Sequence, residues 1–166
     1  MRAHPLPLMM AAFLVAACAA LPATTTLAPS PDDEAGAQRA LSDFFRLLNE
    51  GRYNEAVPLY GGSYEVMRDH NPSLPPTDFA ALMRNACEHN GVHCYLSKRI
   101  TFIQITGQKE FLFDVEFLTP DGSLFIRGQC CGASPTDQPP QSVFPYRVIR
   151  SPGGRFLVTQ MPPYVP

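Results

Sequence analysis

Cysteine and histidine are the residues of this 166-residue chain with the clearest capacity for covalent or metal chemistry. Four of its five cysteines lie beyond residue 18, and an even number of cysteines in an exported domain favours two disulfides. These four cysteines are Cys87, Cys94, Cys130 and Cys131. As neighbours on a predicted strand, Cys130 and Cys131 should point to opposite faces and bond with the other pair rather than with each other. Which cysteine meets which stays open, and one disulfide with two free thiols is an alternative.

The same region offers a zinc site as a weaker alternative. Cys87, His89, His93 and Cys94 lie within eight residues, and zinc takes cysteine and histidine ligands in tetrahedral sets. No Cys-x-x-Cys spacing accompanies them, and histidines at a helix end also serve as exposed partners for backbone carbonyls. We therefore predict neither a bound metal nor a cofactor.

General acid–base chemistry would need a carboxylate or imidazole beside a hydrogen-bond donor inside a cavity. The candidates of these types are Asp114, Glu116, His70, Tyr53, Tyr60 and Tyr64. Both carboxylates alternate with apolar residues, so we expect them on the outer, wetter face of a strand, where Arg127 can pair with either across the sheet. His70 precedes Asn-Pro and is expected in a surface loop. No nucleophile elbow, phosphate-binding loop or dinucleotide fingerprint occurs, which favours a non-enzymatic domain.

The first 17 residues are typical of a bacterial lipoprotein signal peptide. Arg2 provides a positive start, and residues 6–17 form an apolar run that is short for a membrane-spanning helix. The run ends in Val-Ala-Ala-Cys, which matches a lipobox whose cysteine, Cys18, would carry the lipid. The alternatives are secretory cleavage after residue 19, which would discard Cys18, and a buried helix with an ordinary cysteine.

Residues 18–31 are rich in alanine, threonine and proline and predict a tether between the membrane and the folded part. The remaining residues, 32–166, suit a single domain. The formal net charge of −2 gives no basic surface for nucleic acid. No second run of 18 apolar residues follows the leader, so we expect the mature chain not to span the membrane.

Helical patterns fill the first half of the domain and strand patterns fill the second half. The predicted helices begin near residues 30–33, 54, 63 and 77, with Ser30 or Asp32 as the first cap and Gly51 after the first helix. The predicted strands cover 94–106, 110–118, 123–131, 143–150 and 155–161, followed by a proline-rich tail. This order predicts an α+β fold, with N-terminal helices packed on one face of a curved antiparallel sheet of about four to five strands.

The run LNEGRYNEAVPLY at 48–60 resembles members of the nuclear transport factor 2-like superfamily, which has a cone-shaped, cystatin-like fold. In that superfamily the first helix is followed by glycine, an aromatic residue and alanine, here Gly51, Tyr53 and Ala56. The resemblance covers about residues 34–161. It implies the cone, and its members range from isomerases and dehydratases to pure binding domains, so the fold does not select a function.

These observations predict an extracytoplasmic, membrane-anchored module that binds a ligand or another protein. The cone mouth would be bordered by Tyr53, Tyr60 and Tyr64 and would take a small apolar ligand, and the sheet would alternatively serve as a homodimer face. An equally simple interpretation is that these tyrosines pack within the helical layer and border no binding site. The competing function is an isomerase or dehydratase that uses the cone cavity.

Overall fold

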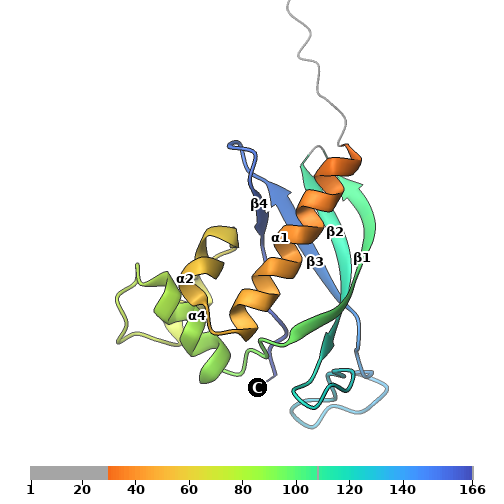
Figure 1. The fold of residues 1–166 in the computed structure, drawn as a ribbon. Helices are drawn as coiled ribbons and strands as arrows, with labels where there is room; N and C mark the ends of the chain where they lie inside the picture. Colours follow the sequence, from red (N-terminus) through yellow and green to blue (C-terminus); the bar gives the residue numbers. More distant parts are fainter. Residues whose placement is uncertain (1–29, 108, 166) are drawn as a thin grey trace, which may run out of the picture.

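The computed structural model describes residues 30–107 and 109–165 (Figure 1). Within them the helices precede the strands, as predicted. The elements are α1 Pro31–Asn49, α2 Tyr53–Ala56, the 3-10 turn η1 Val57–Leu59, α3 Glu65–Asp69, α4 Phe79–Glu88, β1 Leu96–Thr106, β2 Glu110–Leu118, β3 Phe144–Arg150 and β4 Phe156–Val158. None of the helices in this part of the chain is long and apolar enough to cross a bilayer. The predicted signal peptide, Cys18 and nearly all of the tether lie outside the described residues.

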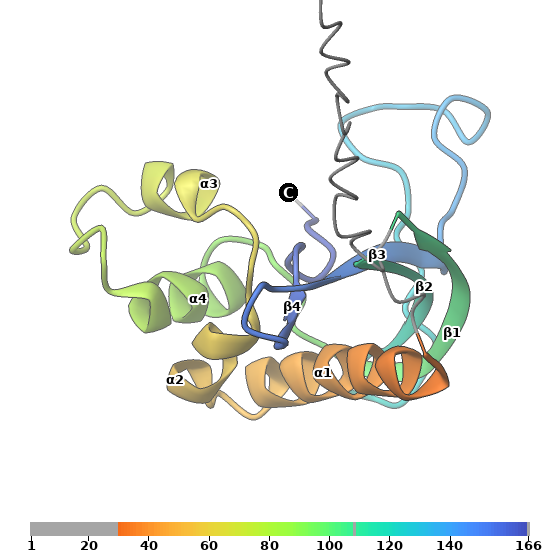
Figure 2. The ribbon, with the colours of Figure 1, turned by 90° about the horizontal axis from the view of Figure 1, so that it is seen from above.

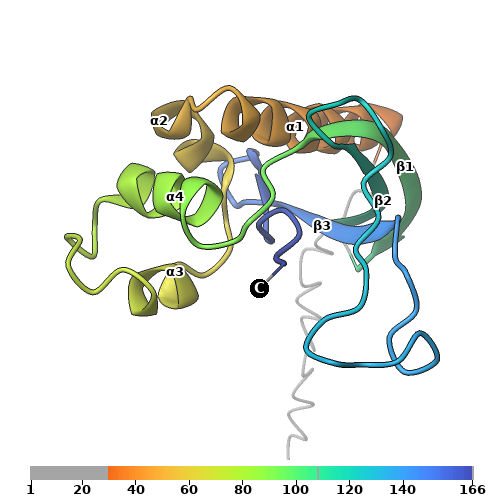
Figure 3. The same cartoon turned by 90° about the horizontal axis from the view of Figure 1, so that it is seen from below.

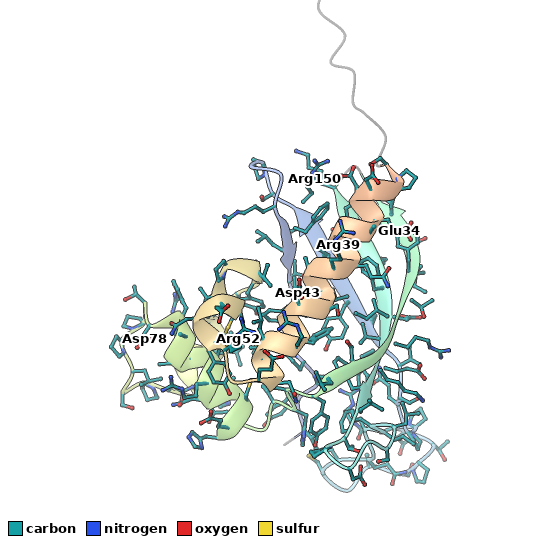
Figure 4. The ribbon with its side chains drawn as sticks, viewed as in Figure 1. Glu34, Arg39, Asp43, Arg52, Asp78 and Arg150 are labelled. Carbon is teal, nitrogen blue, oxygen red and sulfur yellow. A yellow bond between two sulfur atoms is a disulfide. The ribbon has the colours of Figure 1, made fainter. Side chains whose placement is uncertain are left out.

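Helix α1 forms because both its ends and its stripe of apolar residues favour it. The Ser30 hydroxyl accepts the Asp33 N–H while the Asp33 carboxylate accepts the Ser30 N–H, which is a capping box, and Pro31 occupies the first turn. Its apolar stripe is buried, and Gly51 takes a left-handed φ of 71° just beyond its end. Figure 4 shows Arg39 and Asp43 on the opposite face, which points away from the sheet.

The sheet has the strand order β1-β2-β3-β4 and is antiparallel throughout. Strand β2 is central, and every second residue of it is buried, as the alternation of its sequence predicts. Its inward side chains are Phe111, Phe113, Val115 and Phe117. Figure 2 shows the sheet curving around one side of α1, while the three short helices gather beyond the far end of α1. The α+β fold with helices packed on the sheet is thus confirmed.

The predicted strand 123–131 is wrong. This segment makes only isolated bridges, from Leu118 to Leu124 and from Arg127 to Gln141. The edge of β2 that it would need is paired with β3 instead, from Glu110 opposite Ile149 to Val115 opposite Phe144. Strand β3 buries three alternating side chains, whereas the segment 123–131 buries only Phe125. Pairing β3 with β2 therefore buries more apolar surface and is more stabilising.

The expected pairing of the cysteines is also wrong. Cys87 is bonded to Cys94, and Cys130 is bonded to its neighbour Cys131. The expectation assumed an extended strand, but residues 130–133 form a turn in which the Ala133 N–H donates to the Cys130 carbonyl at 3.0 Å. Cys131 has a φ of 60° and Gly132 a φ of 83°. In this conformation neighbouring side chains are no longer directed to opposite faces.

Candidate binding groove

A groove of about 340 Å³ lies between α3, the end of α4 and the C-terminal segment, which we define as residues 161–165. Val66 and Met67 of α3, with His70 directly after the helix, form one wall. Most of the other lining side chains are apolar or aromatic, and Ser63 and Asn90 are polar. The full set of these residues is Tyr60, Ser63, Ala86, Asn90, Val92, Met161, Pro162 and Tyr164. The groove therefore lies beside the core that fills the concave face of the sheet, rather than inside it.

Helix α3 is held against α4 by a chain of two side-chain amides. The Asn71 Nδ2 donates to the Met67 carbonyl at 2.7 Å, and the Asn85 Nδ2 donates to the Asn71 Oδ1 at 2.9 Å. Asn71 is buried, so these bonds also satisfy a polar group that would otherwise be costly. Val66 of the same helix lines the groove and is 67% exposed.

The opposite wall is the C-terminal segment, which sequence reasoning treated as a free proline-rich tail. It pairs with the chain leaving α4, because the His93 N–H donates to the Pro163 carbonyl at 2.9 Å and the Val165 N–H donates to the Gly91 carbonyl at 3.0 Å. Figure 3 shows this segment beside the chain that leaves α4. Gly91 has a φ of 74°, and a Cβ there would lie 2.6 Å from the Val165 carbonyl oxygen, so the close approach requires glycine.

Asn90 supplies the groove with a buried polar group. Its Nδ2 has no hydrogen-bond partner among the described residues. A buried amide donor left unpaired costs about 1–3 kcal/mol. A ligand with a carbonyl, ether or hydroxyl oxygen would recover part of that cost if the Asn90 side chain turned this buried nitrogen toward the groove.

The structure brings together two of the three tyrosines predicted at the cavity mouth. Tyr60 lines the groove, donates to the Ser63 carbonyl at 3.1 Å, and meets the edge of Tyr64 with ring centroids 5.0 Å apart. Burial raises the pKa of the Tyr64 phenol to about 12, so it is neutral at physiological pH.

Tyr53 lies elsewhere and donates to the Glu88 Oε1 at 3.1 Å. It borders a separate, more polar hollow of about 240 Å³ beside the Cys87–Cys94 bond. Of the three tyrosines predicted at one mouth, Tyr60 lines the groove, Tyr64 packs against Tyr60 without lining it, and Tyr53 lies at the other hollow.

The acid–base candidates lie in separate places: Asp114 and Glu116 share a hollow of about 280 Å³ with Arg99, Thr101 and Val143, whereas His70 lines the groove. Asp114 and Glu116 lie on the outer face of β2, as expected, and Glu116 pairs with Arg99 at 2.6 Å. The expected pairing of Arg127 with either carboxylate is wrong, since Arg127 contacts the Gln141 side chain and lies over the Phe144 ring. His70 lines the groove, where it is exposed and its Nδ1 lies 2.9 Å from the Val66 carbonyl oxygen.

The residues of the alternative zinc site are engaged with other groups. Cys87 and Cys94 are bonded to each other, and the His93 Nδ1 lies 2.8 Å from the Tyr95 hydroxyl. Within residues 30–107 and 109–165, no cluster of three or more His, Cys, Asp or Glu side chains has a geometry that could hold a metal ion.

No protein-family model matches this sequence, and neither a curated protein nor a solved structure matches it. The structure itself gives an α+β fold with N-terminal helices packed against a four-stranded antiparallel sheet. The finer relation to the nuclear transport factor 2-like superfamily rests on the resemblance at residues 48–60.

Sequence reasoning did not find most residues of the groove. Val66, Met67, Asn90 and Tyr164 come from three segments that are far apart along the chain. The one local signal was Asn90-Gly91, a helix-ending pair whose glycine also permits the close approach of another backbone. The partner of that approach could not be read from the sequence.

Proposed function

We propose that this protein is an extracytoplasmic lipoprotein whose nuclear transport factor 2-like domain binds a small apolar ligand in the groove between α3 and the C-terminal segment. The observation that carries the proposal is a mostly apolar groove whose lining includes Asn90, a residue with a buried side-chain nitrogen that has no partner among the described residues. The ligand class is a molecule with a hydrocarbon body and at least one hydrogen-bond acceptor. Its body would pack on the apolar side chains of the walls and its acceptor would meet Asn90.

Size and chemistry both support this class of ligand. Small-molecule sites enclose about 300–1,000 Å³ and combine apolar walls with a few placed polar groups. The groove has about 340 Å³, which is at the small end of that range. Its walls hold Val66, Met67, Met161 and Pro162 and carry no formal charge apart from any proton on His70.

We favour binding over catalysis because the candidate bases are poorly placed for general acid–base work. Two of the three, Asp114 and Glu116, lie on the outer face of the sheet, in a hollow that shares no lining residue with the groove. His70 lies on the rim and is exposed, so it is not held in the dry surroundings that strengthen such catalysis. An isomerase or dehydratase would have to rely on this one side chain.

Replacing Val66 by aspartate should weaken binding of the apolar fluorophore N-phenyl-1-naphthylamine about tenfold, because a carboxylate on the wall must be desolvated. Val66 is 67% exposed, so the fold should be retained. The matched control is Ile103→Asp, at an apolar residue of β1 that is 49% exposed and outside the groove. Fluorescence titration measures both dissociation constants. Equal weakening by the two changes, or no saturable binding by the unmodified protein, would reject the groove as the site.

The membrane tether is tested separately. A Cys18→Ala variant expressed with its own leader should lose the lipid, because only the thiol of that residue can accept it, and should leave the membrane fraction. Mass spectrometry of the mature N-terminus and immunoblots of membrane and soluble fractions measure the two effects. The control is Cys131→Ala, which should stay with the membrane. If the Cys18 variant is still lipid-modified and membrane-bound, the lipoprotein assignment is wrong.

A further inference from the structure

The two disulfides differ in what they hold together. Cys87–Cys94 has a sequence separation of 7, joins the end of α4 to the approach to β1, and packs against the hydrophobic core. Closing a loop of this length removes chain entropy from the unfolded state and so stabilises the fold. Cys130–Cys131 joins adjacent residues and encloses no intervening chain, so that source of stabilisation is nearly absent. The second bond is therefore not a staple between elements of the fold.

The backbone at the second bond is in an uncommon conformation. Cys131 is the only non-glycine residue with positive φ in the described part of the chain. For a residue with a side chain, the left-handed region is higher in energy than the extended and right-handed regions. The bond between the two sulfurs and this backbone conformation occur together, so breaking the bond would allow Cys131 to return to a lower-energy conformation.

The bond is also accessible to a reagent from solution. Cys131 is exposed, and no residue from 128 to 140 is buried. This loop leaves the sheet after the bridge between Arg127 and Gln141, and Figure 3 shows it projecting away from the helices. Apart from that bridge its hydrogen bonds are local, such as the Cys130 N–H donating to the Gln138 Oε1 at 2.9 Å. An attacking thiolate can reach Cys131 without the core opening.

We propose that Cys130–Cys131 is a thiol–disulfide exchange site that accepts two electrons from an external dithiol. One thiolate of the dithiol attacks the Cys131 Sγ, the bond between the two cysteines breaks, and the Cys130 thiolate leaves and takes a proton. The second thiol of the reductant loses its proton and attacks the mixed disulfide, which releases Cys131 as a thiolate that is then protonated. The protein gains two thiols and the reductant becomes a disulfide. A partner of suitable chemistry is a protein with a Cys-x-x-Cys dithiol.

The test uses the mature protein purified without reducing agent and equilibrated at graded ratios of reduced to oxidised dithiothreitol. Free thiols are trapped with N-ethylmaleimide and located by peptide mass spectrometry. We expect Cys130 and Cys131 to be labelled together. Their bond should be reduced at a ratio of reduced to oxidised dithiothreitol about tenfold or more below the ratio that reduces Cys87–Cys94. A protein reduced at that lower ratio should then bind one equivalent of phenylarsine oxide, which requires two adjacent thiols.

The matched variants are Cys130→Ser with Cys131→Ser, and Cys87→Ser with Cys94→Ser. The first pair of changes should abolish arsenical binding and the second should preserve it. The labelling map of the unmodified protein decides the question even if the second variant does not fold. Simultaneous reduction of both bonds, earlier reduction of Cys87–Cys94, or peptides that link Cys87 or Cys94 to Cys130 or Cys131 would each overturn the proposal.

Discussion

Replacing Phe45 by alanine should lower the free energy of unfolding by about 3–5 kcal/mol. The ring is fully buried where α1 meets the sheet. Its edge-to-face contacts with Phe117 and Tyr146 have centroid distances of 5.0 and 4.9 Å, so one side chain joins the helix to both β2 and β3. Truncation removes that apolar surface and leaves a cavity that two packed layers cannot easily close. Urea denaturation followed by circular dichroism measures the change.

The control is Ile126→Ala, an apolar side chain that is 55% exposed outside the core. Its loss should change stability by less than about 0.5 kcal/mol. Since single domains are stable by only about 5–15 kcal/mol, the Phe45 variant should lose a large part of its total stability. A Phe45 variant no less stable than the Ile126 variant would mean that the ring is not packed between helix and sheet as described.

The elements that the sequence predicted well are those in which one local rule decides the outcome. In α1 the Ser30 cap and the helical spacing of Ala37, Leu41 and Phe44 agree, and the helix begins and ends close to the predicted residues. In β2 the period of two in EFLFDVEFL decides which face is buried, because a strand with one buried face has one register that fits.

The segment 123–131 could not be assigned locally because two segments compete for one edge of β2. Its apolar run, Leu124, Phe125 and Ile126, resembles a strand, yet Ile126 is exposed in the structure. The later segment Phe144–Arg150 buries Phe144, Tyr146 and Val148 on one face and takes the edge. A choice between partners depends on the total surface buried, which no single window of sequence contains.

The cysteine prediction failed as a consequence of the strand prediction. Once residues 130–133 form a turn, the rule that adjacent side chains diverge no longer applies, and Cys130 and Cys131 can meet. Among the cysteines that the structure describes, Cys94 then has only Cys87 left as a partner. The groove could not be predicted from the sequence for a related reason. Its walls come from α3 and from residues 161–165, and nothing local to either segment specifies that the two lie opposite each other.

Replacing Gly91 by alanine should both destabilise the protein and weaken ligand binding, because this residue positions one wall of the groove. Its φ of 74° is uncommon for residues with a side chain, and the added Cβ would lie 2.6 Å from the Val165 carbonyl oxygen. The contact is with backbone, so the C-terminal segment has to move. We expect a loss of about 2–3 kcal/mol in unfolding free energy, of which about 1 kcal/mol comes from the backbone conformation alone.

Gly122→Ala separates the two contributions. Gly122 has a similar φ of 82°, but no atom lies within 4 Å of the position its Cβ would take. This control should therefore show only the conformational cost and should bind the fluorophore as the unmodified protein does. In the Gly91 variant, displacement of Met161, Pro162 and Tyr164 should weaken binding of the fluorophore about tenfold, because apolar contact is lost. If both glycine variants bind equally well, the C-terminal segment does not shape the site, and the ligand must be held by α3 and α4 alone.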